Sequence, residues 1–267
     1  MDAERIWALL MAVRAKQPLV HNITNFVVMN NSANALLALG ASPAMVHSLD
    51  EVEDFVSISQ ALVVNIGTLF SEQIAACKLA AMRAKVAGVP WILDPVGAGA
   101  TSYRRAAAGA LAKLNPSVIR GNGSEILTLA EQARSGQGRG VDSLHGSESA
   151  LDGARTLARE TGAVVAITGA VDYVTDGERI TAIENGHPLM TRVTGLGCSA
   201  TAVVGAFLAV ERDAFAATTA GLAVFGVAGE IAAERAAGPG TLQVALLDTL
   251  YALDEGTLKA KLRATVR

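Results

Sequence analysis

Short, mostly apolar runs recur along the chain, and Gly, Pro, Asn or Asp residues bound most of them. Strands that are buried on both faces of a parallel sheet have this continuous apolar character instead of a strict alternation. We predict such strands at Leu19–Ile23, Ala44–His47, Leu62–Ile66, Trp91–Leu93, Val118–Ile119 and Val164–Thr168. A tight hairpin follows, in which an Asp-Gly turn joins Tyr173–Thr175 to Arg179–Ile183.

Helical patterns fill the intervals between these strands, and several end at a glycine, the residue favoured just past a helix C-terminus. We predict helices at Phe26–Leu39, Ser71–Ala87, Ser147–Thr161, Asp213–Ala237 and Leu242–Leu253. Regular alternation of strands and helices predicts one doubly wound α/β domain over residues 1–267, with a mostly parallel sheet and helices on both faces. Such folds bind ligands beyond the carboxyl ends of their strands.

Two long uncharged segments, Val193–Val210 and Ala214–Gly229, approach the length of a membrane span. Both are rich in Gly, Ala, Ser and Thr, and the Arg212-Asp213 turn between them leaves no loop that would lie outside a bilayer. We therefore predict two buried helices at the centre of a soluble domain.

Composition and charge narrow the classes of function. Hydrophobic residues make up 51% of the 267 positions, and the net charge is −3 without a basic run, which disfavours nucleic-acid binding. Cys77 and Cys198 are too few for a disulfide framework, and the N-terminus lacks the pattern of a secretory signal, so we expect a cytoplasmic protein. The low-complexity segment Ser135–Gly140 is predicted to be a mobile loop.

The motif Thr194–Thr201 is the first candidate for chemistry, because Gly195 and Gly197 precede a long apolar helix. Glycine lets the backbone approach a ligand closely, and the free N–H groups and dipole of a helix N-terminus attract anions. The segment therefore suits a phosphate in transfer. A plain tight turn into a buried helix is the alternative interpretation.

Three further motifs follow predicted strands. Asp94 ends one strand, and Glu125 lies three residues after Asn122 beyond another, so both carboxylates suit Mg²⁺ held beside phosphates. Arg120 can neutralise phosphate charge. Thr168, at the end of a further strand, can bind a phosphate or a ribose. Turn and helix-cap roles are the alternatives for these residues.

Polar residues also follow the first predicted strand, where Asn25 either caps the next helix or binds substrate. Met45 ends another short strand and suits contact with a flat, sulfur-containing ring, although filling the core is the default role of methionine. All five motifs follow predicted strands, which is where a doubly wound fold builds its ligand site.

The ordered motifs HNITN, DPVGAGA, RGNGSE, ITGAVDYVTDG and TGLGCSATA closely resemble the hydroxyethylthiazole kinase family of the ribokinase-like superfamily, from about Pro18 to Ala237. The resemblance implies a ribokinase-like fold without a separate lid domain. It implies phosphoryl transfer from ATP, with Mg²⁺, to the hydroxyl of 4-methyl-5-(2-hydroxyethyl)thiazole in thiamine biosynthesis or salvage. It also implies a homotrimer with active sites between subunits.

Carried over residue by residue, the resemblance implies a role for each motif. Met45 and Gly195 match positions that contact substrate, with Asn25 beside them. Arg120 and Thr168 match positions that contact ATP, and Asn122 belongs to the same motif as Arg120. Asp94 and Glu125 match the magnesium region, and Cys198 matches the catalytic position. The wider superfamily has Asp at that last position, and Leu196 replaces a more usual Thr or Val. The amides of Gly195, Gly197 and Cys198 are expected to stabilise the transferred phosphoryl group.

Other classes of function stay open at this stage. A cysteine-nucleophile enzyme would use Cys198, whose pKa a helix N-terminus lowers, with His21 or His47 as its base. That interpretation leaves Asp94 and Glu125 without a role. A non-catalytic nucleotide-binding module would bind ATP without turnover, and a hydroxymethylpyrimidine kinase is the alternative within the same fold.

Overall fold

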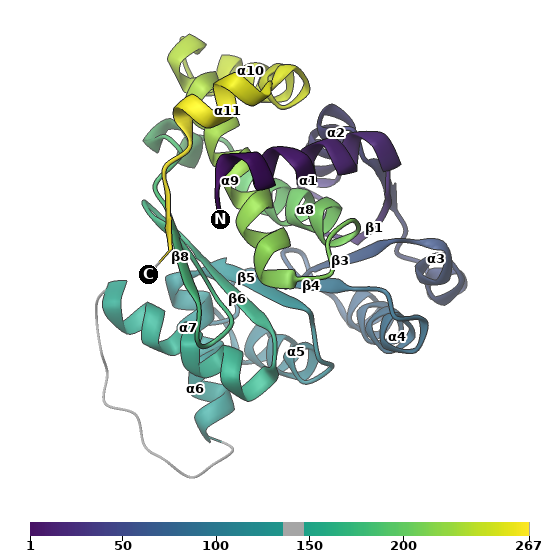
Figure 1. The fold of residues 1–267 in the computed structure, drawn as a ribbon. Coiled ribbons are helices and arrows are strands. Elements are labelled where there is room, and N and C mark those ends of the chain that lie inside the picture. The colour runs from purple at the N-terminus through teal and green to yellow at the C-terminus, as the bar shows by residue number, and fades with distance from the viewer. Residues whose placement is uncertain (136–146, 267) are drawn as a thin grey trace.

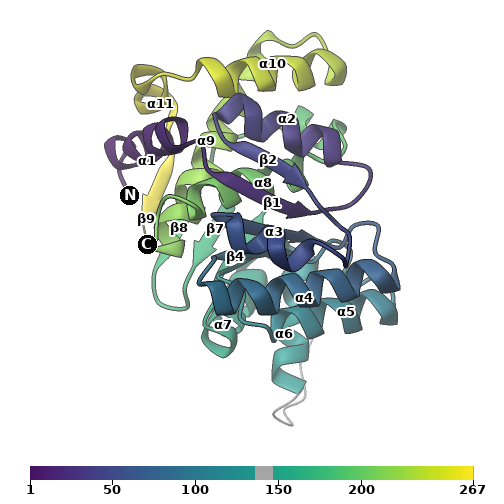
Figure 2. The ribbon, with the colours of Figure 1, turned by 90° about the vertical axis from the view of Figure 1, so that its right-hand side faces the viewer.

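A nine-stranded sheet forms the middle layer of the protein, and helices cover both of its faces (Figures 1 and 2). The computed structural model describes residues 1–135 and 147–266. The strands lie in the order β2-β1-β3-β4-β5-β6-β7-β8-β9. Neighbouring strands from β2 to β6 run parallel, whereas the pairs from β6 to β9 are antiparallel. The predicted doubly wound, mostly parallel α/β fold is confirmed.

The strands are short, and those inside the sheet from β1 to β6 are mostly buried, as their apolar sequences require, whereas the edge strands β2 and β9 are partly exposed. Their bounds are β1 (Leu19–Ile23), β2 (Ser42–Met45), β3 (Ala61–Asn65), β4 (Trp91–Asp94), β5 (Val118–Asn122), β6 (Val164–Thr168), β7 (Asp172–Thr175), β8 (Ile180–Ile183) and β9 (Ala264–Val266). The predicted hairpin is formed by β7 and β8, which pair directly.

Two hydrophobic cores lie on opposite faces of the sheet. The first is built by α1 (Ala3–Lys16), α2 (Met29–Leu39), α8 (Leu196–Leu208), α9 (Ala214–Arg235), α10 (Pro239–Ala252) and α11 (Glu255–Lys261). The second is built by α3 (Val52–Ile58), α4 (Ser71–Ala87), α5 (Ser102–Ala112), α6 (Gly123–Ser135) and α7 (Ser147–Thr161). Side chains of the parallel strands enter both cores, which explains their continuous apolar runs.

The register of the parallel strands brings polar residues together at one edge of the sheet. Asn65 at the end of β3 is paired with Asp94 at the end of β4. Asn122 at the end of β5 is paired with Thr168 at the end of β6. The carboxyl ends of four consecutive strands therefore place side chains on one crevice, as expected for this fold.

Helices α8 and α9 occupy the centre of the first core because glycines let them approach their neighbours closely. A Cβ atom at Gly221 would lie 2.9 Å from the Cα atom of Val204, and one at Gly205 would lie 2.7 Å from the Val63 side chain. Within residues 1–135 and 147–266, α9 alone is long and apolar enough to cross a membrane, and 83% of its most apolar window is buried in the fold. The two uncharged segments thus form the predicted buried helices.

Several boundaries differ from the sequence-based prediction. Strand β2 begins at Ser42 and ends at Met45, not His47, because its register on β1 starts with Ser42 opposite Leu19. Pro43 has no N–H group, which an edge strand such as β2 tolerates. Helix α2 begins at Met29 because the preceding residues form a turn.

Other elements depend on long-range contacts that local patterns do not reveal. Strand β9 near the C-terminus pairs with β8 and was not predicted. The sequence-based prediction also lacks helices α1, α3, α5 and α11. Strand β5 continues past Ile119 to Asn122 because it pairs with β6 over that length. Of the loop predicted at Ser135–Gly140, Ser135 ends α6, and residues 136–140 lie outside the described residues.

Candidate active site

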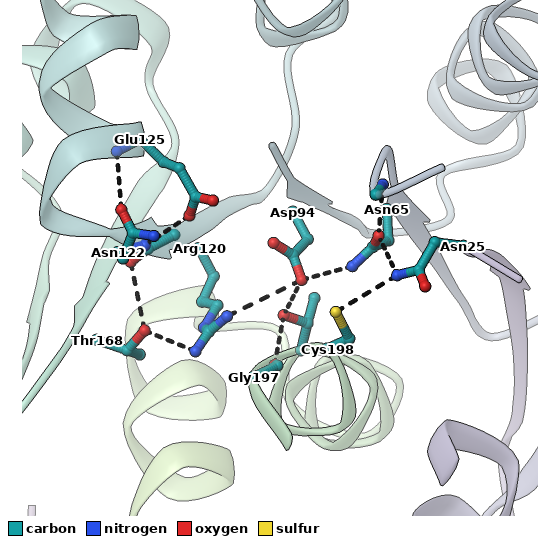
Figure 3. Close-up of polar contacts among 12 residues, drawn as sticks. Asn25, Asn65, Asp94, Arg120, Asn122, Glu125, Thr168, Gly197 and Cys198 are labelled. Atoms are coloured by element: carbon teal, nitrogen blue, oxygen red, sulfur yellow. Dashed lines mark hydrogen bonds and ion pairs between the residues drawn. The ribbon is translucent and has the colours of Figure 1, made fainter. Parts of the chain in front are cut away.

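The carboxylate of Asp94 lies at the centre of a polar cluster between the sheet edge and the start of α8 (Figure 3). The residue is 1% exposed. Its Oδ2 atom accepts hydrogen bonds from Asn65 Nδ2 at 2.7 Å and from Thr201 Oγ1 at 2.8 Å, and Arg120 Nη1 lies 3.9 Å away. Its Oδ1 atom is buried without a hydrogen-bond partner among the described residues. A buried acceptor without a donor is costly, so this oxygen is available for a ligand.

Burial raises the pKa of Asp94 to about 6, and the nearby charge of Glu125 acts in the same direction. The charge of Arg120 and the hydrogen bonds from Thr201 and Asn65 lower the pKa but do not cancel the effect of burial. The carboxylate is therefore predominantly ionised at neutral pH, while it is held in a site that solvates it poorly.

The second carboxylate, Glu125, connects two loops at the same edge. Its Oε1 atom accepts the N–H of Gly97 at 2.8 Å, and its Oε2 atom accepts the N–H of Asn122 at 2.8 Å. In return, Asn122 Oδ1 accepts the N–H of Glu125 at 3.0 Å. This reciprocal pair is a capping box at the start of α6. The helix-cap interpretation of Asn122 and Glu125 is thus realised, while each carboxylate oxygen keeps a lone pair for a further ligand.

Arg120 joins the sheet edge to the first turn of α8. Its Nη2 atom donates to Thr168 Oγ1 at 2.6 Å, so the predicted ATP contacts on β5 and β6 meet directly. A Cβ atom at Gly197 would lie 3.0 Å from Nη1 of the same guanidinium. Glycine at this position therefore lets the positive charge of Arg120 lie against the helix N-terminus.

The first turn of α8 presents the N–H groups expected from the sequence. Gly195 precedes the helix with a φ of 79°, a left-handed conformation that favours glycine. A Cβ atom there would also overlap the side chain of Val28. The amides of Leu196, Gly197 and Cys198 have no preceding helical carbonyl to bond, so this N-terminus suits an anion. Of the three amides expected from the sequence, that of Gly195 belongs to the residue before the helix. The unusual Leu196 side chain is buried in the core beside the sheet.

Cys198 faces the amino-terminal strands, where Asn25 Nδ2 lies 3.5 Å from its Sγ atom. Burial raises the pKa of the Cys198 thiol to about 11, and the charge of Asp94 raises it further. Hydrogen bonds from Asn65 and Asn25 and the charge of Arg120 act in the opposite direction. The sequence-based expectation of a lowered pKa at this helix N-terminus is wrong, because desolvation and a nearby carboxylate outweigh the helix.

Neither candidate base for a nucleophilic cysteine is directed at Cys198. His21 Nε2 bonds the carbonyl oxygen of Val46 at 2.9 Å, and burial lowers the pKa of His21 to about 4. His47 Nε2 lies 3.0 Å from the carbonyl oxygen of Thr24. The geometry therefore does not support a cysteine–histidine catalytic pair.

Met45 lies at the same sheet edge but outside the hydrogen-bonded cluster. It ends β2 opposite Asn22 of β1, so β1 and β3 separate it from Asp94. It is only partly buried, which leaves its side chain accessible to a bound molecule. A role in substrate contact stays a prediction.

A cavity of about 550 Å³ lies beside Arg120, which forms part of its lining. The cavity is bounded by the antiparallel strands, α8, α9 and the 3₁₀ helix η1 (Pro188–Arg192). Its volume lies within the range of small-molecule sites. The lining includes Arg120, Thr168, Asp172, Met190, Gly197 and Phe225. Asp172 accepts the N–H of Gly169 at 2.9 Å, and burial raises its pKa to about 6.

Sequence reasoning assigned no role to Asn65, Thr201 or Asp172. Asn65 was placed inside an apolar strand, although a polar residue at a strand end is the signal that identified Asp94. Thr201 was quoted within the glycine motif, and its contact with Asp94 is made one turn into α8. Strand register and helix docking, which bring these residues together, are long-range properties of the fold.

A doubly wound sheet that brings two carboxylates, an arginine and a helix N-terminus to one edge, beside a cavity that Arg120 and Gly197 help to line, is typical of a small-molecule kinase. Within that class, a sequence model of the Hydroxyethylthiazole kinase family matches residues 10–256, and the chain belongs to this family.

The chain is similar to several proteins over nearly their whole length. Hydroxyethylthiazole kinase of Granulibacter bethesdensis is 57% identical over 256 residues, covering 96% of this chain and 93% of that protein. The enzyme of the same name from Leptothrix cholodnii is 53% identical over 272 residues, covering 100% and 97%. The solved hydroxyethylthiazole kinase structure from Pyrococcus horikoshii OT3 has 43% identity and a TM-score of 0.92, with 99% of both chains covered.

More distant structures share the fold alone. A pyridoxal kinase of Bacillus subtilis, solved as an ADP complex, is 18% identical with a TM-score of 0.61, covering 79% of this chain and 91% of that one. The sheet and its flanking helices are thus common to a wider group of kinases.

The raised pKa of Cys198 predicts slow alkylation. With a pKa of about 11, roughly one thiol in 10⁴ is ionised at pH 7, so iodoacetamide labelling should accelerate about tenfold per pH unit up to pH 10. Peptide mass spectrometry of Cys198 checks this, and a Cys77→Ala variant removes the other thiol. A labelling rate that reaches a plateau below pH 8 would show an activated thiolate instead.

Proposed function

We propose that the protein transfers the γ-phosphoryl group of ATP to the primary alcohol of 4-methyl-5-(2-hydroxyethyl)thiazole, in thiamine biosynthesis or salvage. Family membership supports this acceptor. The observation that carries the chemistry is the position of Arg120, whose guanidinium lies against Gly197 between the cavity and the Asp94 cluster. Phosphates that extend from the cavity would reach the helix N-terminus there.

On the nucleotide side, ATP occupies the cavity with its phosphates directed toward Arg120. Thr168 and Asp172 line this cavity and offer polar groups to the nucleoside or its phosphates. The free amides at the start of α8 hold the transferred phosphoryl oxygens without reorganisation, which is how such sites stabilise a transition state. Asn122 contributes by capping α6 and holding Glu125 in place.

On the acceptor side, the thiazole ring lies near Met45, and its hydroxyl reaches Asn25, Gly195 and Cys198. A thiol with a pKa of about 11 is neutral at pH 7, so Cys198 positions the alcohol and is a weak base at most. Phosphoryl transfer passes through a loose transition state in which the alcohol proton leaves late. Positioning therefore matters more than base strength.

Asp94 and Glu125 would hold Mg²⁺ beside the phosphates. The unpartnered Oδ1 atom of buried Asp94 fits a cation directly or through water. Residues 1–135 and 147–266 contain no group of three or more His, Cys, Asp or Glu side chains able to hold a metal, which fits an ion held mainly by phosphate and water oxygens. When bound, the ion neutralises phosphate charge.

Removing the charge of either carboxylate is expected to lower the rate of phosphoryl transfer while leaving the folded state intact. Asp94→Asn and Glu125→Gln should each lower kcat by at least about a hundredfold, or roughly 3 kcal/mol in the barrier. Thermal unfolding and circular dichroism should stay close to those of the parent. Near-normal turnover of both variants at limiting Mg²⁺ would remove the metal assignment.

The proposed acceptor is tested by ADP release with a panel of heterocyclic alcohols at equal ATP. The thiazole alcohol should give the highest kcat/KM and a phosphorylated product in ³¹P NMR. Hydroxymethylpyrimidine and pyridoxal serve as comparators of the same chemical type. A higher kcat/KM with either comparator would show that the thiazole alcohol is not the preferred acceptor. Nucleotide binding without any turnover would indicate a non-catalytic binding module.

We further propose that the chain acts as a single kinase domain in the cytoplasm, and as a homotrimer whose sites lie between subunits. Phe26 and Phe70 support an interface near the acceptor side, because they stack at 5.8 Å with 57% and 41% of their surfaces exposed. Light scattering at micromolar concentration should give three times 27.4 kDa. A monomeric mass would contradict both the trimer and the shared sites.

A further inference from the structure

Hydrogen bonds to Gly67, Asn25 and Asp94 constrain the side-chain amide of Asn65. The residue ends β3 and is 1% exposed. Its Oδ1 atom accepts the N–H of Gly67 at 3.0 Å and Nδ2 of Asn25 at 2.8 Å. Its Nδ2 atom donates to Asp94 Oδ2 at 2.7 Å. Asn65 therefore connects the acceptor side of the site to the central carboxylate.

These contacts permit one orientation of the Asn65 amide. The backbone N–H of Gly67 can only donate, so the atom of Asn65 that meets it at 3.0 Å must be the acceptor, and the other end of the amide meets Asp94 Oδ2 at 2.7 Å. Oδ1 of Asn65 must therefore face Gly67, and Nδ2 must face Asp94. Reversing the amide would place donor against donor at one end and acceptor against acceptor at the other, at a residue that is almost fully shielded from bulk solvent.

The orientation of the Asn65 amide also fixes the orientation of the Asn25 amide. Because Asn65 offers an acceptor, Asn25 must present Nδ2, which also points to Cys198 Sγ at 3.5 Å. Its Oδ1 atom has no hydrogen bond from any residue of 1–135 or 147–266. Figure 3 shows this oxygen on the side of the amide turned away from Asn65. Asn25 is left with one free acceptor beside the thiol at the start of α8.

We propose that Asn65 is a positioning residue, which fixes the amide of Asn25 so that its Oδ1 accepts a hydrogen bond from the hydroxyl of the acceptor alcohol. That hydrogen bond would turn the O–H proton toward Asn25 and leave an oxygen lone pair free to face the phosphoryl group. The proposal rests on the proposed function in requiring an alcohol as acceptor, and on no other feature of the substrate.

Gly67 offers a way to displace Asn25 without altering Asn65 or Asp94. A Cβ atom at Gly67 would lie 2.7 Å from Nδ2, 2.8 Å from Cγ and 2.9 Å from Cβ of Asn25. Contacts this short force the Asn25 side chain to move. Gly240 is a matched control, because a Cβ atom there meets nothing within 4 Å.

The kinetic test compares Gly67→Ala with Gly240→Ala in the full-length protein at saturating Mg·ATP. Gly67→Ala should raise KM for the alcohol by about fivefold to tenfold, which is the factor that one ordinary hydrogen bond provides. The Kd of a non-hydrolysable ATP analogue should stay within about twofold, because no nucleotide contact changes. An unchanged KM for the alcohol would overturn the proposal.

Two substitutions of Asn65 separate positioning from a purely structural role. Asn65→Asp keeps the acceptor for Gly67 and Asn25 but sets a carboxylate against Asp94, so KM for the alcohol should hold while kcat falls at least about tenfold. Asn65→Leu removes all three hydrogen bonds, so both parameters should worsen. An Asn65→Leu variant that keeps the parental KM for the alcohol would contradict the proposal, because the amide of Asn25 would then be fixed without Asn65.

NMR tests, without any substrate, whether Asn65 fixes the amide of Asn25 (the relay). This test is therefore independent of the proposed function. The side-chain NH₂ signal of Asn25, assigned by its loss in Asn25→Asp, should exchange slowly in the parent and rapidly in Asn65→Leu. Equal exchange in both would overturn the relay. A wild-type protein that ignores the thiazole alcohol but keeps this exchange pattern would refute the acceptor alone.

Discussion

The carboxylate of Asp94 is buried where water cannot solvate it, and three elements satisfy one of its oxygens. Asn65 from β3, Thr201 from α8 and Arg120 from β5 all approach Oδ2. A buried charge is tolerated only when such partners surround it. Satisfying this carboxylate therefore fixes how α8 docks on the sheet, and it leaves the second oxygen for a ligand.

The same constraint explains why a cysteine is compatible with this site. The charge of Asp94 and the burial of Cys198 both raise the pKa of the thiol. A neutral thiol adds no further negative charge beside ATP phosphates. An aspartate at the Cys198 position would add such a charge. Catalysis in the proposed mechanism therefore relies on fixed amides, on Arg120 and on alignment of the alcohol, with little demand for a base.

Much of the site was predictable because each motif obeys a local rule. Gly195 and Gly197 before an apolar helix indicated an open helix N-terminus, and Asp94 at a strand end indicated a polar group at the same edge of the sheet. Asn65 was not found, because its importance comes from the register that pairs it with Asp94. The pKa of Cys198 was misjudged because a local helix rule does not include burial. Strand β9 was missed because only pairing with β8 makes those residues a strand.

Direct transfer from ATP to the alcohol, without a phosphorylated or otherwise covalent enzyme, is the central claim. The stereochemical course at phosphorus tests it most directly. With ATP made chiral at the γ-phosphorus by oxygen isotopes, a single in-line displacement gives a product of inverted configuration, which is the predicted result. Retention would require two successive displacements through an enzyme group such as Cys198, and it would contradict the mechanism.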